Sequence, residues 1–263
     1  DKMFVSETSG STGEPLLFMK DEEWDSWSRA SAFRGDSWYG VEPWDRNGYF
    51  WGYNIDSSKE KKTRLLDALQ NRFRIFTYDE NSLRRFIKSL SGAHYLHGYS
   101  SMIYEVSRII NNSNIETSDL KLKMVKGTSE TIYDHYQDEV KKAFGLKMIS
   151  EYGAAEAGII SFECPMGSMH LNMESCIVEE EDGEIIVTNL NAYSFPIIRY
   201  RLGDSIVLED KNFVCPCGMK HSVLKEVTGR VGKRIFGKAR IYPSFTVYYI
   251  IKNIYLEEGL SIN

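Results

Sequence analysis

Apolar residues recur at helical spacing along several stretches of the chain, and these stretches predict amphipathic helices. Residues 20–35 place Trp24, Trp27 and Phe33 on one helical face, with Gly35 at the end of the helix. In residues 82–90 and 100–112 the apolar side chains gather on one side: Leu83, Phe86, Ile87 and Leu90 in the first, and Met102, Ile103, Val106, Ile109 and Ile110 in the second. A further helix is expected over residues 131–145, ending at Gly145.

The strands predicted between these helices indicate the fold class. Residues 122–130 and 146–150 are strand-like and flank the helix of residues 131–145, which makes a parallel crossover unit. From Cys176 onward, two alternating runs flank Asp182 and Gly183, a pair that is typical of a hairpin turn. We therefore expect an α/β protein with layered mixed sheets flanked by helices and an added antiparallel β region.

Composition and charge exclude several classes of protein. The 263 residues are 42% hydrophobic and 26% charged, which suits a globular protein and argues against disorder. The net charge of -5 gives no support for nucleic-acid binding. No apolar run approaches the roughly 20 residues of a membrane span, and no basic-then-apolar leader is present, so we expect a cytoplasmic protein without a membrane partner. The charged residues 56–64 are expected to form a solvated loop that leads into a helix.

The four cysteines are too few for a disulfide framework and favour a metal site. Cys164 lies shortly before His170, and Cys215 and Cys217 share the turn-like segment CPCG. Three thiolates and an imidazole form a closed tetrahedral site that suits structural Zn²⁺.

An alternative reading of the same residues is that Cys164 and Cys176 are buried as small hydrophobic side chains and that only the CPCG pair lies near the surface. Cys176 lies in an apolar alternation, so a core-facing thiol is expected there. His221 is a second candidate for the imidazole ligand.

The segment ETSGSTGEP, residues 7–15, has the chemistry of an anion-binding loop. Backbone N–H groups of a Gly-rich turn and Ser or Thr hydroxyls can surround a phosphate. A polar surface turn would have a similar composition. No Gly-Lys-Ser/Thr sequence follows, so the segment is not a Walker A loop.

Four motifs in order carry a resemblance to a known family: TSGSTGEP (8–15), EYGAAEAG (151–158), NAYSFPIIRYRLGD (191–204) and VTGRVGKRI (227–235). They resemble the core motifs of the adenylate-forming superfamily of acyl-CoA ligases, peptide-synthetase adenylation domains and luciferases. FPIIRYRLGD, CPCG and GKARIYPS look most like the phenylacetate–coenzyme A ligase branch, which includes capsular-polysaccharide adenylating proteins. The resemblance covers nearly the whole chain.

The resemblance implies a role for each matching residue. The mobile loop around the β- and γ-phosphates of ATP would be Thr8, Ser9, Gly10, Ser11, Thr12 and Gly13. Adenine would lie beside Gly127, Thr128, Ser129, Tyr152 and Gly153, with Tyr152 stacked on it, and the ribose hydroxyls would donate to Asp204. The catalytic set would be Glu156 as the Mg²⁺ ligand, Arg230 as a nucleotide contact and Lys233 near a hinge. Structural zinc, seen in some members of the branch, is implied as well.

The implied reaction is ATP-dependent adenylation of a small carboxylic acid, giving an acyl-AMP and pyrophosphate. A second step would transfer the acyl group to a thiol or amine, commonly that of coenzyme A. Aromatic and polar side chains are expected to line the acid pocket, or else to be ordinary core: Trp51, Tyr53, His97 and Tyr99. Adenylyl transfer to a sugar or cofactor, and a non-catalytic nucleotide-binding homologue, are the alternatives. A homodimer stays open.

The chain also departs from the family pattern. Ala155 stands where a hydroxyl is usual before the motif glutamate, and Glu14 stands where many members carry Lys. We expect an excerpt of a longer protein, namely the large N-terminal domain of the adenylate-forming fold without the small C-terminal domain that bears a catalytic lysine. Residues 1–175 would be its α/β nucleotide-binding core, residues 176–263 the β-rich remainder, and residues 229–235 the region of the hinge. Such a chain should bind nucleotide better than it turns it over.

Overall fold

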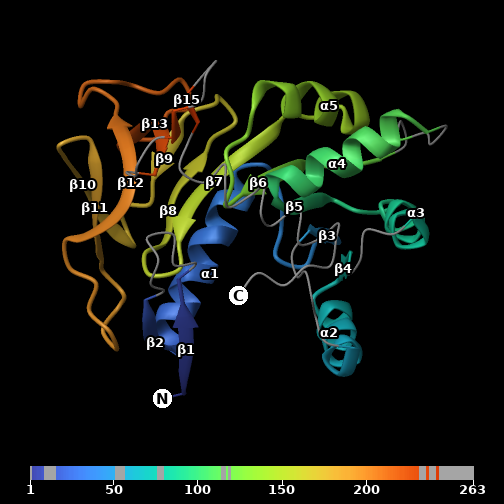
Figure 1. Cartoon of the computed structure of the whole chain (residues 1–263), viewed down its shortest axis with the longest axis horizontal. Coiled ribbons are helices and arrows are strands. Elements are labelled where there is room, and N and C mark those ends of the chain that lie inside the picture. The colour runs from blue at the N-terminus through green and yellow to red at the C-terminus, as the bar shows by residue number, and fades with distance from the viewer. Residues whose placement is uncertain are drawn as a thin grey trace.

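The computed structural model describes residues 2–8, 16–50, 57–75, 80–113, 117, 120–230, 235–236 and 241–242 (Figure 1). Its first half contains β1 (Met3–Glu7), β2 (Leu17–Asp21), α1 (Glu22–Ser37), β3 (Asn47–Phe50), α2 (Ser57–Leu69), β4 (Arg72–Arg74), α3 (Glu80–Ser89), β5 (Tyr95–Tyr99), α4 (Ser100–Asn111), β6 (Met124–Thr128) and α5 (Asp134–Phe144). Strands follow: β7 (Met148–Ala154), β8 (Gly158–Glu163), β9 (Met169–Leu171), β10 (Cys176–Glu181), β11 (Glu184–Asn189), β12 (Tyr200–Leu208), β13 (Val223–Arg230), β14 (Ile235–Phe236) and β15 (Ile241–Tyr242).

Eleven of the described strands form one sheet in the order β10-β11-β12-β13-β9-β8-β7-β6-β5-β3-β4. In this order, the pairings among β4, β3, β5, β6 and β7 are parallel. All pairings on the other side of β7, as far as β10, are antiparallel. The mixed α/β class and the added antiparallel region are therefore confirmed. Among the described helices, none combines the length and the apolar character that crossing a membrane requires.

Local chemistry accounts for several element boundaries. The Asp21 carboxylate accepts a 2.7 Å hydrogen bond from the Trp24 backbone N–H and caps the start of α1. Gly145 ends α5 in the left-handed conformation at φ 71°. Asp182 and Gly183, both at positive φ, form the turn between β10 and β11, as the hairpin pattern predicts.

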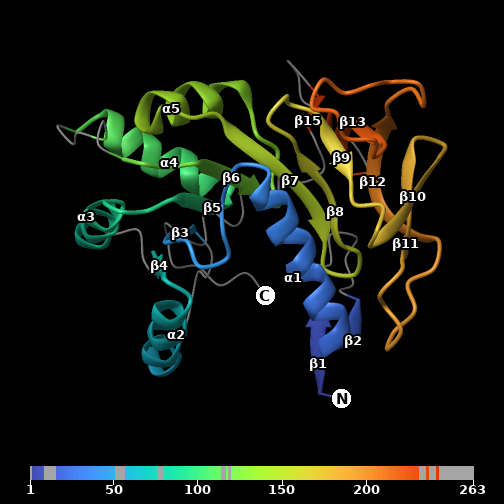
Figure 2. The ribbon, with the colours of Figure 1, turned by 180° about the vertical axis from the view of Figure 1, so that it is seen from behind.

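Helices α3, α4 and α5 cover one face of the parallel strands and form the largest part of the core. Leu83, Phe86, Ile87 and Leu90 of α3 are all buried there, as the periodicity predicts. In this core they join alternate strand residues such as Leu96 and Val125. Because neighbouring strand residues point to opposite faces, the Tyr95 and Met124 side chains lie on the other face of the sheet, where α1 packs against β8 (Figure 2).

Two expectations about helices are wrong. Trp24 is 1% exposed, but Trp27 and Phe33 are 42% and 43% exposed, so the three do not share a buried face. The reason is that α1 packs through Trp24, Ser31 and Gly35, where the small residues let the sheet approach closely. The stretch expected as a solvated loop is also helical, because α2 begins at Ser57.

Gly35 provides a test of this close packing. In a helix interior, Gly→Ala ordinarily stabilises by about 1 kcal/mol. A Cβ atom at Gly35 would overlap the ring of Phe162, however, so Gly35→Ala should lower the free energy of unfolding by about 1–3 kcal/mol in urea denaturation. Ser26→Ala, on the exposed side of the same helix, is the control and should change stability by less than about 0.5 kcal/mol. Equal or greater stability of Gly35→Ala would contradict this packing.

Candidate functional site

The carboxyl ends of β5, β6 and β7 meet at one edge of the sheet, where ligands bind in open α/β folds. Gly127, Thr128 and Ser129 lie here, at and just beyond the end of β6. A Cβ atom at Gly127 would come too close to Ser100 Oγ, so only glycine allows this approach of β6 to the start of α4. Ser129 has a φ of 65°, an uncommon conformation for a residue with a side chain.

Tyr152 and Asp204 meet beside this edge although 52 residues separate them. Tyr152 lies in β7 and Asp204 in β12, and the Tyr152 hydroxyl donates a 2.7 Å hydrogen bond to Asp204 Oδ2. Gly153 follows in β7, and the backbone of Arg230 pairs with Asp204 across β12 and β13. The structure thus brings together the residues predicted for adenine and ribose. Their roles stay predictions.

Glu156 lies in the turn that follows β7 and is buried. Its backbone carbonyl accepts a 3.2 Å hydrogen bond from the Asn189 side-chain amide, which fixes the turn against β11. Thr8 pairs with Leu16 through two bonds of 2.9 and 3.0 Å and closes the β1–β2 hairpin below the predicted phosphate loop. The loop residues Ser9, Gly10, Ser11, Thr12 and Gly13 lie outside the described residues, as do Lys233 and the side chain of Arg230.

The acid-pocket candidates are only partly described. Trp51 and Tyr53 lie outside the described residues, while His97 and Tyr99 belong to β5. The Asn47 side-chain nitrogen donates to the Asp45 carbonyl, so its oxygen, 3.2 Å from His97 Nε2, accepts from that ring nitrogen. Burial, together with the nearby charge of Lys126, holds the pKa of His97 well below its usual value. His97 is therefore neutral, and its ring lies beside that of Tyr95 on the same face of the sheet as Lys126.

A buried group of charges lies under this edge, and the sequence patterns did not indicate it. The Lys126 ammonium is 2.7 Å from Asp36 Oδ1 and 2.8 Å from Glu151 Oε2, with a side-chain exposure of 4%. Burial disfavours the charged lysine, but Glu151 and Asp36 outweigh it and raise the pKa of Lys126 above its usual value. The three residues, called here the Lys126 triad, join α1 to β6 and β7. The one available signal was a lysine inside the apolar strand MVKGT.

The predicted metal ligands come together at the opposite edge of the sheet. Cys164 follows β8, His170 lies in β9, and Cys215 and Cys217 lie between β12 and β13. Their ligand atoms all lie within 4.8 Å of one another, with Cys164 Sγ 3.8 Å from Cys215 Sγ and Cys217 Sγ 3.2 Å from His170 Nε2. Three thiols and one imidazole at these distances fit a tetrahedral zinc site.

Two features prepare these side chains for a metal. The His221 backbone carbonyl lies 3.2 Å from His170 Nδ1 and accepts a hydrogen bond from its N–H, which leaves Nε2 as the ligand atom. Burial alone would raise the pKa of Cys215, but hydrogen bonds from Ser168 and Cys217 lower it to about 6. The lowered pKa favours the thiolate form of Cys215, which is the form that binds metal.

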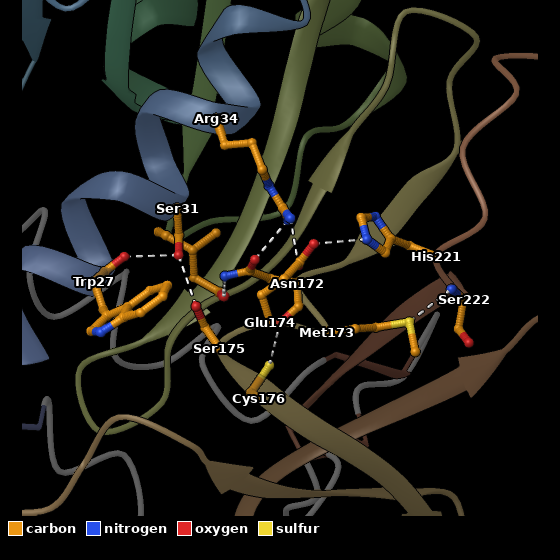
Figure 3. A network of polar contacts seen from close by, with 11 residues as sticks. Trp27, Ser31, Arg34, Asn172, Met173, Glu174, Ser175, Cys176, His221 and Ser222 are labelled. Carbon is orange, nitrogen blue, oxygen red and sulfur yellow. Dashed lines mark hydrogen bonds and ion pairs between the residues drawn. The ribbon is translucent and has the colours of Figure 1, made fainter.

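The alternative imidazole ligand and the fourth cysteine lie elsewhere. The His221 ring faces Glu174, with Nε2 2.9 Å from the carboxylate (Figure 3). Arg34 of α1 contacts the same carboxylate and donates a 2.6 Å hydrogen bond to Asn172 Oδ1. This network ties α1 to the segment between β9 and β10. Cys176 is buried in the core of the antiparallel strands, as its apolar surroundings predict.

Two known proteins resemble the chain in sequence. Protein CapK of Staphylococcus aureus is 27% identical over 273 aligned residues, which cover 99% of this chain and 58% of CapK. Indoleacetate–lysine synthetase of Pseudomonas savastanoi is 28% identical over 112 residues, which cover 40% of this chain and 28% of that enzyme. The chain therefore spans little more than half the length of the first relative. No protein-family model matches it.

Solved structures of ligases share the fold over part of their length. An open conformation of 2-hydroxyisobutyryl-CoA ligase in complex with 2-HIB-AMP and CoA matches with a TM-score of 0.69 and 18% identity, over 95% of this chain and 58% of the ligase. A malonyl-CoA ligase complex with methylmalonyl-CoA and AMP matches with a TM-score of 0.56 and 17% identity, over 90% of this chain and 55% of that one.

The Lys126 triad can be tested by unfolding. Lys126→Met leaves two buried carboxylates without their cation and should lower the free energy of unfolding by about 3–5 kcal/mol. The neutral combination of Asp36→Asn, Lys126→Met and Glu151→Gln removes all three charges at similar volume and should recover most of that loss. Chemical denaturation measures both variants. An unchanged midpoint for Lys126→Met alone would show that the triad does not hold buried charge.

Proposed function

Because the relatives and structural neighbours confirm that the chain resembles the adenylate-forming superfamily, we propose that it adenylates a carboxylic acid with ATP. The products are an acyl-AMP and pyrophosphate. The observation that supports this most strongly is the contact of Tyr152 with Asp204 at the ligand-binding edge of the sheet. An aromatic ring and a carboxylate at one place suit adenine stacking and ribose binding.

The nucleotide would follow the edge of the sheet. Gly127, Thr128 and Ser129 border the adenine on one side, with Tyr152 and Gly153 opposite, and Asp204 accepts from the ribose hydroxyls. The phosphates extend toward Glu156, which would hold Mg²⁺, and toward Arg230 and the loop of Thr8 to Gly13. Mg²⁺ would neutralise phosphate charge there. The protein groups orient the α-phosphate toward the acid and exclude water from it.

The acid would bind at the ends of β3 and β5. The neutral His97 and the neighbouring Tyr99 would line its pocket, together with Trp51 and Tyr53.

We propose transfer of the acyl group to coenzyme A as the second step, in line with the two neighbouring ligases, which bind CoA or a CoA thioester. Transfer to an amine is the second candidate, because one relative is an indoleacetate–lysine synthetase. Product analysis distinguishes a thioester from an amide. A stable adenylylated sugar or cofactor would instead indicate adenylyl transfer, the alternative to acid activation.

The test is acid-dependent exchange of labelled pyrophosphate into ATP by the complete native polypeptide. A panel of aryl, fatty and amino acids should contain one that supports exchange. Glu156→Gln should lower the exchange rate by roughly 10²-fold or more, because charge stabilisation at the phosphates is lost. Glu105→Gln, on the exposed side of α4, is the matched control and should leave the rate unchanged. ATP binding without exchange for any acid would refute the adenylation reaction.

We also propose that the cluster of Cys164, His170, Cys215 and Cys217 holds structural Zn²⁺. The set is buried or nearly so and offers four protein ligands, as closed structural sites do. Zinc bound there would join three parts of the chain: the end of β8, strand β9 and the segment between β12 and β13.

Metal analysis of the purified protein should find one zinc ion per chain. Cys217→Ala should remove it and lower the melting temperature, because one of four ligands is lost. Cys176→Ala is the control, since this buried thiol lies outside the cluster and its loss should leave the zinc content unchanged. Full zinc occupancy in Cys217→Ala would contradict the assignment.

A further inference from the structure

Lys20 is a partly buried cation in β2 that forms no close ion pair with the described residues. Its ammonium lies 5.6 Å from the centre of the Phe18 ring and 5.1 Å from that of Trp24. The described carboxylates that act on its charge, those of Asp25 and Glu156, do so without forming an ion pair. Taking a charged lysine out of water is costly unless a partner compensates. The position therefore favours an anionic ligand.

The neighbouring tryptophan gives a second, independent sign of a missing acceptor. Trp24 is 1% exposed, and its indole N–H finds no hydrogen-bond acceptor among the residues that the structure describes. Buried polar groups are nearly always hydrogen-bonded in native proteins. Beside the start of α1 there thus lie an ammonium without a close ion pair and, among the described residues, an indole N–H without an acceptor.

These donors lie on the side of the turn that contains Glu156, toward which the phosphates are proposed to extend. Trp24 and Phe18 pack against Ala192, which follows shortly after Asn189, and Asn189 holds the backbone of Glu156 at 3.2 Å. Burial lowers the pKa of Lys20, while the charges of Asp25 and Glu156 act on it in the opposite direction. Glu156 is therefore near enough to influence the ammonium.

We propose that Lys20 is a further catalytic residue, whose ammonium binds the phosphate chain of ATP opposite Glu156. The inference rests on the proposed function and adds a cation to it. Lys20 supplies this positive charge from β2, where it stabilises the negative charge of the departing pyrophosphate.

The test compares Lys20→Met with Lys2→Met in the complete native polypeptide. Methionine retains the packing of the lysine stem over the aromatic rings and removes the charge. Lys2 is a matched control, because its ammonium lies 5.3 Å from the Phe4 ring on the paired strand and is exposed. Calorimetry gives the dissociation constants of ATP, AMP and inorganic pyrophosphate for both variants.

Lys20→Met should weaken ATP and pyrophosphate by about tenfold or more and leave AMP within about twofold, since an ionic hydrogen bond to phosphate is lost. Lys20→Arg should restore most of the affinity, and Lys2→Met should bind all three ligands as the wild type does. Unchanged ATP affinity in Lys20→Met, or an equal loss for ATP and AMP, would overturn the role of Lys20. Failure of the wild type to bind ATP would instead overturn the proposed function along with it.

Discussion

The buried ammonium of Lys126 is the constraint on which the arrangement of the proposed nucleotide edge depends. It draws Asp36 of α1 and Glu151 of β7 to one point, so the helix and the two strands cannot shift independently. Buried ion pairs contribute little net stability compared with apolar packing, but they permit few alternative arrangements. Gly127 and Thr128 directly follow Lys126 in β6, and Tyr152 directly follows Glu151 in β7. The triad thus fixes the strand ends that would carry the nucleotide.

Helix α1 connects the two edges of the sheet. Its first turn places Trp24 beside Lys20, on the side of Glu156. Its last turns place Arg34 in the network with Glu174 and Trp38 against the edge of the His170 ring, at a centroid distance of 6.2 Å. Gly35, also in the last turns, lets the helix lie close to Phe162 of β8. One helix therefore supports the proposed adenylation site and the Cys/His cluster together.

The sequence predicted the parts of the molecule that have a local or a chemically distinctive pattern. The apolar stripe of α3, the crossover through α5 and the turn at Asp182 and Gly183 are local patterns, and the structure confirms them. The sequence also groups the four candidate metal ligands, because thiols and imidazoles are rare and chemically specific, and the structure brings them together. Periodicity could not tell which side of α1 packs, so Trp27 and Phe33 were misplaced. The Lys126 triad was missed because its members come from three elements that only the tertiary fold brings together.

ATP is proposed to bind at the carboxyl ends of β5, β6 and β7. The most direct measurement is an experimental structure of the complete native polypeptide with ATP and Mg²⁺. A nucleotide site at this edge predicts adenine beside Tyr152, ribose hydroxyls on Asp204 and phosphates between Glu156 and Lys20. Nucleotide bound at any other surface, with this edge left to solvent, would contradict the claim.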